Sequence, residues 1–306
     1  MVSVHAQQSL PVLLDGAMGS ALALAGVRIE GPAWSSRAVV EAPEEVAKLH
    51  AAYAAAGAVV HTANTFRTTP SALEAWSGAP PGLTARAWVA EAVRIAREAV
   101  PVGHRVAGSL APLDDCYART PPKPDARRLH REQAERLAEA GVDLFLCETF
   151  VVPEEALIAV DAARTTGLPV WVSLTAGPAG DLLGPDAIAR FAREAADHGA
   201  QTVLVNCSPA SLMVRLLEPL SRAGVAFGAY ANVGSAAEGL GALVDWGEPR
   251  PGVEELATRA AKYAAFAEAW VALGASVVGG CCGTTPAHIQ AMSARFACHK
   301  SPSHLH

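Results

Sequence analysis

The stretch Asp143–Thr149 (DLFLCET), followed by Pro153–Thr166 (PEEALIAVDAARTT) and Pro169–Thr175 (PVWVSLT), decides the fold class. The first and third segments are almost continuously apolar, which is typical of strands buried on both faces. The segment between them has helical composition, and Pro153 stands where the first turn of a helix accepts proline. The sequence therefore predicts a strand, a helix and a second, parallel strand.

The same alternation extends toward both ends of the chain. Further strands are expected at Val12–Asp15, Val59–Asn64, Arg105–Leu110, Thr202–Ser208, Val225–Ala231 and Ser276–Cys282. Further helices are expected near Pro43–Ala56, Thr84–Val100, Asp125–Ala140, Pro185–Gly199, Ala210–Ala223, Val253–Leu273 and Pro286–Ala297. Eight such units predict an α/β fold, a single (β/α)₈ TIM barrel over residues 1–297, with a disordered tail at 298–306. The alternative is an open doubly wound sheet, but Gly16 and Gly19 do not make its usual GxGxxG loop.

Composition narrows the class of function. Of 306 residues, 51% are hydrophobic and 18% charged, with a net charge of −6, as in globular proteins without a basic surface for nucleic acid or membranes. No apolar run approaches the roughly eighteen residues of a membrane helix, and the first ten residues do not resemble a secretory signal. A cytoplasmic location is expected. Six cysteines are too few for a disulfide scaffold, so metal binding or catalysis is the better interpretation.

Three cysteines follow the expected strands at one rim. Cys207 ends the sixth strand, and Cys281 and Cys282 end the eighth. The carboxyl ends of barrel strands share one face, so these three thiols are expected to meet there. Three cysteines with an open fourth position form a known type of zinc site. Because zinc deprotonates a bound thiol, such a site is suited to activating a substrate thiol.

The adjacent pair requires an irregular backbone, because successive strand residues point to opposite faces. Glycines on both sides, in GGCCG (279–283), allow the chain to leave strand geometry there. The alternative is that buried cysteines act as small hydrophobic residues. That alternative suits Cys147, and Cys116 or Cys298 as well, better than a vicinal pair among glycines.

Several motifs resemble one enzyme family. They are LDGAMGS (14–20), TANTF (62–66), CETF (147–150), VNCS (205–208), YANVG (230–234) and VVGGCCGTTPAHI (277–289). In this order they resemble the homocysteine S-methyltransferase family, over essentially the whole chain. That family includes S-methylmethionine- and betaine-dependent enzymes and the homocysteine domain of cobalamin-dependent methionine synthase.

The resemblance implies a zinc-dependent transfer of a methyl group to the thiol of homocysteine, giving methionine. It makes Cys207, Cys281 and Cys282 the Zn²⁺ ligands. It also implies that Asp15 and Glu148 bind the amino-acid part of homocysteine, where their carboxylates can hold the ammonium group.

Other positions carry weaker expectations. The backbone of Gly16–Gly19 can receive the substrate carboxylate, and Asn232 matches a family asparagine that orients neighbouring groups. Each acid has an alternative role, as a helix cap or an arginine partner. The segment Tyr230-Ala231-Asn232 departs from the family's YPN, and Leu183-Gly184 stands where an Asp-Gly pair is expected.

The methyl donor is expected to be a small onium compound, S-methylmethionine or S-adenosylmethionine. In the loop after the seventh strand, an aromatic ring beside acidic residues could hold the positive charge of this donor. The alternative is that Trp246 only packs the loop against the protein. These loop residues are Glu238, Asp245, Trp246 and Glu248. Two alternatives remain: a separate cobalamin (corrinoid) protein as donor and partner, or a structural zinc with His61 or His288 as a fourth ligand. The sequence leaves a homo-oligomer open.

Overall fold

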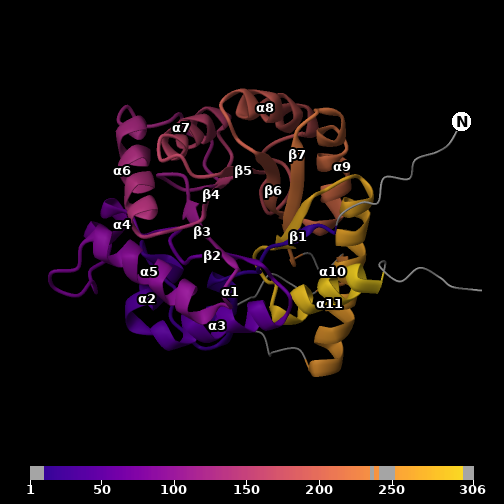
Figure 1. Ribbon diagram of the computed structural model, residues 1–306, viewed down its shortest axis with the longest axis horizontal. Coiled ribbons are helices and arrows are strands. Elements are labelled where there is room, and N and C mark those ends of the chain that lie inside the picture. Colours follow the sequence, from indigo (N-terminus) through magenta and orange to yellow (C-terminus); the bar gives the residue numbers. More distant parts are fainter. Residues whose placement is uncertain (1–9, 235–237, 241–251, 299–306) are drawn as a thin grey trace, which may run out of the picture.

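Eight parallel strands form the centre of the computed structural model, which describes residues 10–234, 238–240 and 252–298. The strands are β1 Val12–Leu13, β2 Val60–Thr62, β3 Arg105–Leu110, β4 Leu144–Phe150, β5 Val170–Thr175, β6 Thr202–Pro209, β7 Ala226–Asn232 and β8 Val277–Gly280. They pair in the order β1-β8-β7-β6-β5-β4-β3-β2, and a bridge between Leu14 and Val60 joins β1 to β2. The predicted (β/α)₈ barrel is confirmed, with helices surrounding the strands (Figure 1).

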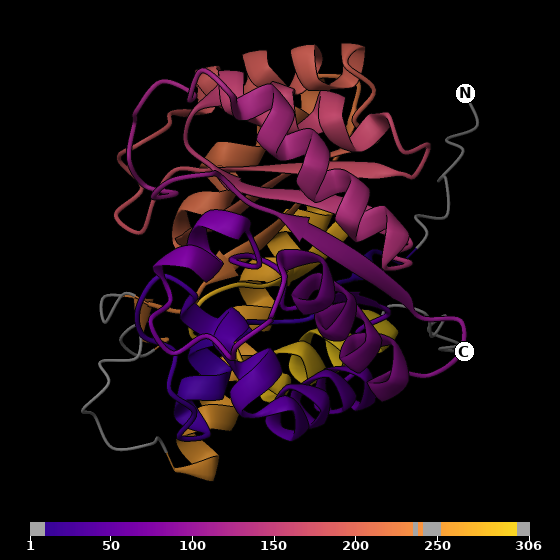
Figure 2. The same ribbon diagram turned by 90° about the vertical axis from the view of Figure 1, so that its left-hand side faces the viewer.

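Helices alternate with these strands. They are α1 Gly19–Leu24, α2 Ala38–Glu41, α3 Pro43–Ala55, α4 Pro70–Ala75, α5 Ala85–Ala99, α6 Ala126–Glu139, α7 Pro153–Arg164, α8 Pro185–Asp197, α9 Met213–Leu217, α10 Val253–Ala272 and α11 Pro286–Cys298, with short 3₁₀ helices η1 Trp34–Arg37, η2 Ala210–Leu212 and η3 Leu220–Arg222. Figure 2 shows the helices from the middle of the chain on one side of the strands and the indigo and yellow helices on the other. Among the described helices, none has the length and apolarity needed to cross a membrane.

The helix predicted over Ala210–Ala223 is wrong as a single element. The chain forms η2, α9 and η3 there instead. Pro219 separates α9 from η3, and because proline lacks an amide hydrogen the α-helical ladder cannot run through it. The predicted strand over Val12–Asp15 is also longer than β1, because Asp15 already belongs to the rim.

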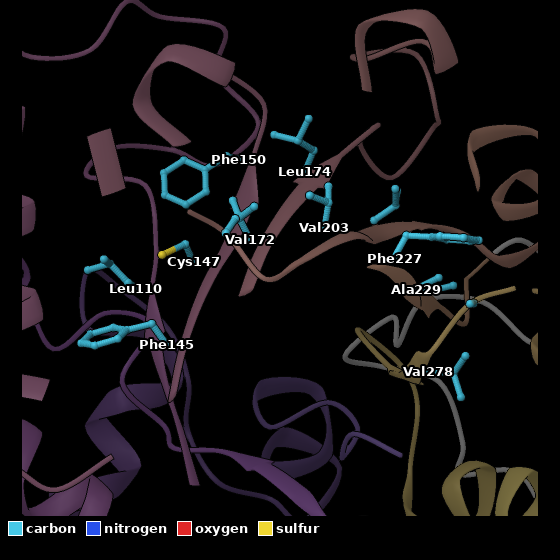
Figure 3. Close-up of a cluster of buried hydrophobic side chains, with 14 of the residues drawn as sticks. Leu110, Phe145, Cys147, Phe150, Val172, Leu174, Val203, Phe227, Ala229 and Val278 are labelled. Atoms are coloured by element: carbon cyan, nitrogen blue, oxygen red, sulfur yellow. The ribbon is translucent and has the colours of Figure 1, made fainter. Parts of the chain in front are cut away.

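Alternation along β4 separates the two layers of the core. Leu144 and Leu146 belong to a cluster contributed almost entirely by strand residues, which fills the barrel interior. Phe145 and Cys147 belong to the larger cluster between strands and helices, where Cys147 packs as a small hydrophobic residue, as one interpretation of the sequence expected (Figure 3). The next position on the inner face is Glu148, which places its carboxyl at the carboxyl-terminal mouth of the barrel.

Candidate active site

The three cysteine thiols expected to meet do lie together. The Sγ atoms of Cys207, Cys281 and Cys282 are all within 4.8 Å of one another, and those of Cys207 and Cys282 are 4.0 Å apart. Two sulfurs bound at 2.3 Å to a tetrahedral zinc stand about 3.8 Å apart, so this donor set fits that ion with little movement. No histidine, cysteine or acid from the described part of the chain joins the group as a fourth ligand.

The backbone around Cys207 is what turns this side chain toward its partners. On β6, Leu204 faces the barrel interior and Val205 faces the helices, so regular alternation would turn Cys207 toward the helices as well. Instead Cys207 has a φ of 47°, and the pairing of β6 with β7 shifts register between Asn206 and Pro209. A bulge of this kind re-aims a side chain, at a strain of roughly 1–3 kcal/mol.

A bend after β8 presents the vicinal cysteines. The end of β7 holds it: the amide of Cys281 donates to the carbonyl of Ala231 at 2.8 Å, and the amide of Val233 donates to the carbonyl of Cys282 at 2.9 Å. Gly283 follows with a φ of 80°, and a Cβ there would lie 2.5 Å from the carbonyl oxygen of Val233. Only glycine fits this position, which explains the glycine after the pair.

The three thiols share one negative charge. Hydrogen bonds donated by Cys207 and Cys281 hold the pKa of Cys282 well below its usual range. Donation to the other two sulfurs raises the pKa of Cys207 well above its usual range. For Cys281, the hydrogen bond with Cys207 lowers the pKa, but the interaction with Cys282 and burial outweigh it, so this pKa is also raised. Two thiols therefore keep their protons until a metal ion displaces them.

Two acids face the same cavity without a cationic partner. Asp15 accepts hydrogen bonds from the amide and the hydroxyl of Thr62, at 2.8 and 3.1 Å. Glu148 accepts from the Ser109 hydroxyl at 2.5 Å and from the Tyr230 hydroxyl at 3.1 Å. Within the described ranges neither acid caps a helix or pairs with an arginine, the alternative roles considered from sequence.

Burial dominates the protonation of both acids. It raises the pKa of Asp15 to about 8 and that of Glu148 to about 7. The charge of Glu148 raises the pKa of Asp15 further, so the two carboxyls are close enough to interact. A cation between them would favour both charged forms. The pair is therefore suited to receiving an ammonium group.

Gly16 closes the wall beside Asp15. A Cβ at Gly16 would lie 2.7 Å from the ring of Tyr53 and 2.9 Å from the Thr284 hydroxyl. The amide of Ala17 already donates to that hydroxyl at 3.1 Å. The amide of Ala17 is therefore not free to bind a substrate carboxylate. If the Gly16–Gly19 backbone receives that carboxylate, it does so through its other amides.

The two histidines considered as a fourth ligand lie elsewhere. The Nε2 of His61 is 3.0 Å from the Nδ1 of His104. The Nδ1 of His288 accepts the amide of Thr285 at 3.1 Å. Neither belongs to the cysteine group found in the described part of the molecule, so the structural-zinc alternative has no fourth ligand there.

A cavity of about 730 Å³ joins the thiols and acids to a further wall. That wall carries aromatic side chains, Trp34, Phe66 and Tyr117. All the described non-glycine residues with positive φ line this cavity: Trp34, Thr149 and Cys207. Strain held in one cavity indicates function. The sequence did not identify Trp34, Phe66 and Tyr117 as site residues, although the length of the segment after the third strand placed it on the active-site face.

Other expected residues have different positions. Asn232 is buried at the end of β7, does not line the cavity, and its Oδ1 has no partner among the described residues. Glu238 is buried and accepts the amide of Ser211 at 2.7 Å, so it is not part of the cavity wall. The other expected donor-binding residues lie outside the described residues: Asp245, Trp246 and Glu248.

Comparisons with known proteins agree with this geometry. The family model described as homocysteine S-methyltransferase matches residues 12–296. The chain is 31% identical over 300 residues to betaine–homocysteine S-methyltransferase 1 of Rattus norvegicus, covering 94% of this chain and 72% of that protein. It is 28% identical to the homocysteine S-methyltransferase of Escherichia coli, covering 93% and 94%. The solved structure of the E. coli homocysteine methyltransferase MmuM in its metallated form superposes with a TM-score of 0.75 at 25% identity, covering 94% of this chain and 97% of that one.

Proposed function

The chain belongs to the homocysteine S-methyltransferase family, and we propose that it moves a methyl group from a small onium donor to the thiol of homocysteine bound at zinc, giving methionine. One observation carries the proposal. Three thiols, with no fourth ligand among the described residues, share a cavity with two buried acids for which the same residues supply no cationic partner. A hydrolytic zinc site would not need a pair of acids placed to hold an ammonium.

The donor set fits zinc. Sulfur ligands favour this ion, and the separation of Cys207 and Cys282 matches tetrahedral coordination. When bound, zinc keeps a coordinated thiol deprotonated and nucleophilic at neutral pH. Cys207, Cys281 and Cys282 hold it, and their supporting backbone comes from the end of β7.

The remaining residues orient homocysteine. Its ammonium lies between Asp15 and Glu148, whose hydroxyl partners keep both carboxyls pointing into the cavity. The backbone amides of Met18 and Gly19, in the cavity lining beside Asp15, receive the substrate carboxylate. Asn232 lies between Ala231 and Val233, whose backbone groups bond to the two vicinal cysteines.

The donor approaches from the open side of the cavity. Its methyl carbon must come within about 3–3.5 Å of the homocysteine sulfur, in line with the bond that breaks. That bond's electron pair stays on the leaving thioether, so the positive charge disappears as the methyl moves. S-methylmethionine and S-adenosylmethionine are the proposed donors, and the aromatic wall suits their sulfonium charge.

The direct test is homocysteine methylation by the zinc-loaded protein alone, with S-methylmethionine, S-adenosylmethionine and betaine in parallel. Methionine formed from a sulfonium compound supports the proposal. Product from betaine alone would contradict the sulfonium assignment. If homocysteine binds the metal but none of the three yields product, the function is instead that of a homocysteine-binding subunit served by a corrinoid protein.

A further inference from the structure

The segment between β3 and α6 forms one wall of the cavity, and the binding of homocysteine does not use it. Five of its residues that line the cavity are polar or ionisable: Asp114, Asp115, Cys116, Tyr117 and Lys123. A wall that faces the thiols but lies outside the homocysteine subsite is where a second substrate would be recognised.

Arg67 fixes the start of this segment. Its guanidinium donates to the carbonyls of Pro112 and Asp114, each at 3.0 Å, and lies 5.0 Å from the ring centre of Phe66. The amide of Leu113 donates to buried Glu155 at 2.9 Å. These contacts tie the segment to the barrel, so the residues that follow Asp114 have a defined position over the cavity.

Tyr117 is the aromatic residue that this segment contributes to the cavity wall. Its amide donates to the carboxylate of Asp115 at 3.0 Å, which turns the chain back toward the cavity. The side chain is half-buried and shares the cavity lining with Cys207 and Cys282. Burial raises the pKa of Tyr117, which keeps its hydroxyl protonated.

The other three aromatic residues that line the cavity are already engaged. Tyr230 donates its hydroxyl to Glu148 at 3.1 Å. Trp34 and Phe66 pack edge to face with ring centres 5.7 Å apart, and Arg67 covers Phe66. Within the described residues, no ring or cation packs on the Tyr117 ring. Tyr117 thus places in the wall of the thiol-lined cavity a ring that no described ring or cation covers.

We infer that Tyr117 recognises the methyl donor by placing its ring against an onium cation, with Asp115 adding negative charge beside it. Arg67 is a positioning residue that acts through the segment it holds. The inference rests on the proposed function, and it names the ligand class as a small sulfonium or quaternary ammonium ion. Aromatic faces attract both kinds of cation.

The test measures binding rather than turnover. Trimethylsulfonium and betaine are titrated calorimetrically into the zinc-loaded full chain without homocysteine. Neither probe has an N–H group, so neither can donate hydrogen bonds to Asp15 and Glu148 as the homocysteine ammonium would. We expect Tyr117→Ala to weaken trimethylsulfonium binding about tenfold and Tyr117→Phe to retain most of it, because the ring supplies most of the attraction.

Arg67→Gln should weaken the same binding without lowering zinc content, and Arg67→Lys should restore part of it. Arg119→Ala is the matched control, since Arg119 is exposed in the same segment and does not line the cavity. If Tyr117→Ala binds both probes as tightly as the unchanged protein, or if that protein binds neither, the inference is wrong. Methionine formation from homocysteine, assayed separately, decides the proposed function independently. The relative affinity of the two probes distinguishes a sulfonium site from a quaternary ammonium site.

Discussion

Replacing Glu148 by glutamine should change how the stability of the metal-free protein depends on pH. Burial raises the pKa of Glu148 from 4.5 to about 7, so the folded chain holds this proton more tightly than the unfolded chain. The stability that the protonated acid contributes is present below pH 4.5 and is lost as pH rises toward 7. Glutamine is neutral throughout and avoids this loss.

The magnitude follows from the shift. A displacement of about 2.5 units at about 1.4 kcal/mol each gives about 3 kcal/mol between the two limits. Between pH 5 and pH 8, most of this difference should develop in favour of Glu148→Gln. The carbonyl of glutamine can still accept the hydroxyl of Ser109, so the loss of a hydrogen bond should not mask the effect.

The assay is thermal unfolding of the reduced, metal-free protein by calorimetry at pH 5, 6, 7 and 8. For a chain of this size, 3 kcal/mol corresponds to a rise of several degrees in the unfolding midpoint. Glu135→Gln is the matched control, because Glu135 is exposed on α6 and its variant should follow the unchanged protein. If the unfolding midpoints of Glu148→Gln and of the unchanged protein depend on pH in the same way, burial does not raise the pKa of Glu148 in the folded protein.

Three further predictions address the metal and the acceptor. Cys281→Ala should abolish zinc binding and activity, whereas Cys298→Ala, at the exposed end of α11, should leave both intact; a zinc assay on both variants decides. Because two thiols hold protons before metal binds, apparent zinc affinity should rise by up to about 100-fold per pH unit near neutrality, and a competition titration showing no pH dependence would contradict the shared-thiolate description. Asp15→Asn should raise the KM for homocysteine at least tenfold with a smaller effect on the KM for the donor, since it removes one charge that faces the ammonium.

The barrel could be predicted because its strands carry the signal in their own composition. Runs such as Leu144–Phe150 are buried along their whole length, and only strands covered on both faces look like that. The break after α9 was missed because a single proline decides it, although the flanking residues have helical composition. The short helices between β1 and α3 were missed because they are too short for an apolar period, and they are held by packing against α3 and α5.

The thiol group could be predicted from the order of strands and the glycines around Cys281 and Cys282. The sequence could not show how Cys207 reaches the other two cysteines. Regular strand alternation would point its side chain toward the helices, and a bulge in β6 turns it toward the cavity instead. Tyr117 lies in an irregular segment and Trp34 begins a four-residue 3₁₀ helix, so neither has a sequence period to read. Their positions follow from long-range contacts, such as those of Arg67 with the segment before Tyr117, which appear only once the chain is folded.

The most direct test of the central claim is X-ray absorption at the zinc edge, on the zinc-loaded protein before and after adding selenohomocysteine. We expect three sulfur neighbours before addition, and three sulfurs plus one selenium at zinc after it. A spectrum with four protein ligands that does not change on addition, or zinc with fewer than three sulfurs, would contradict an open site that receives the substrate thiol.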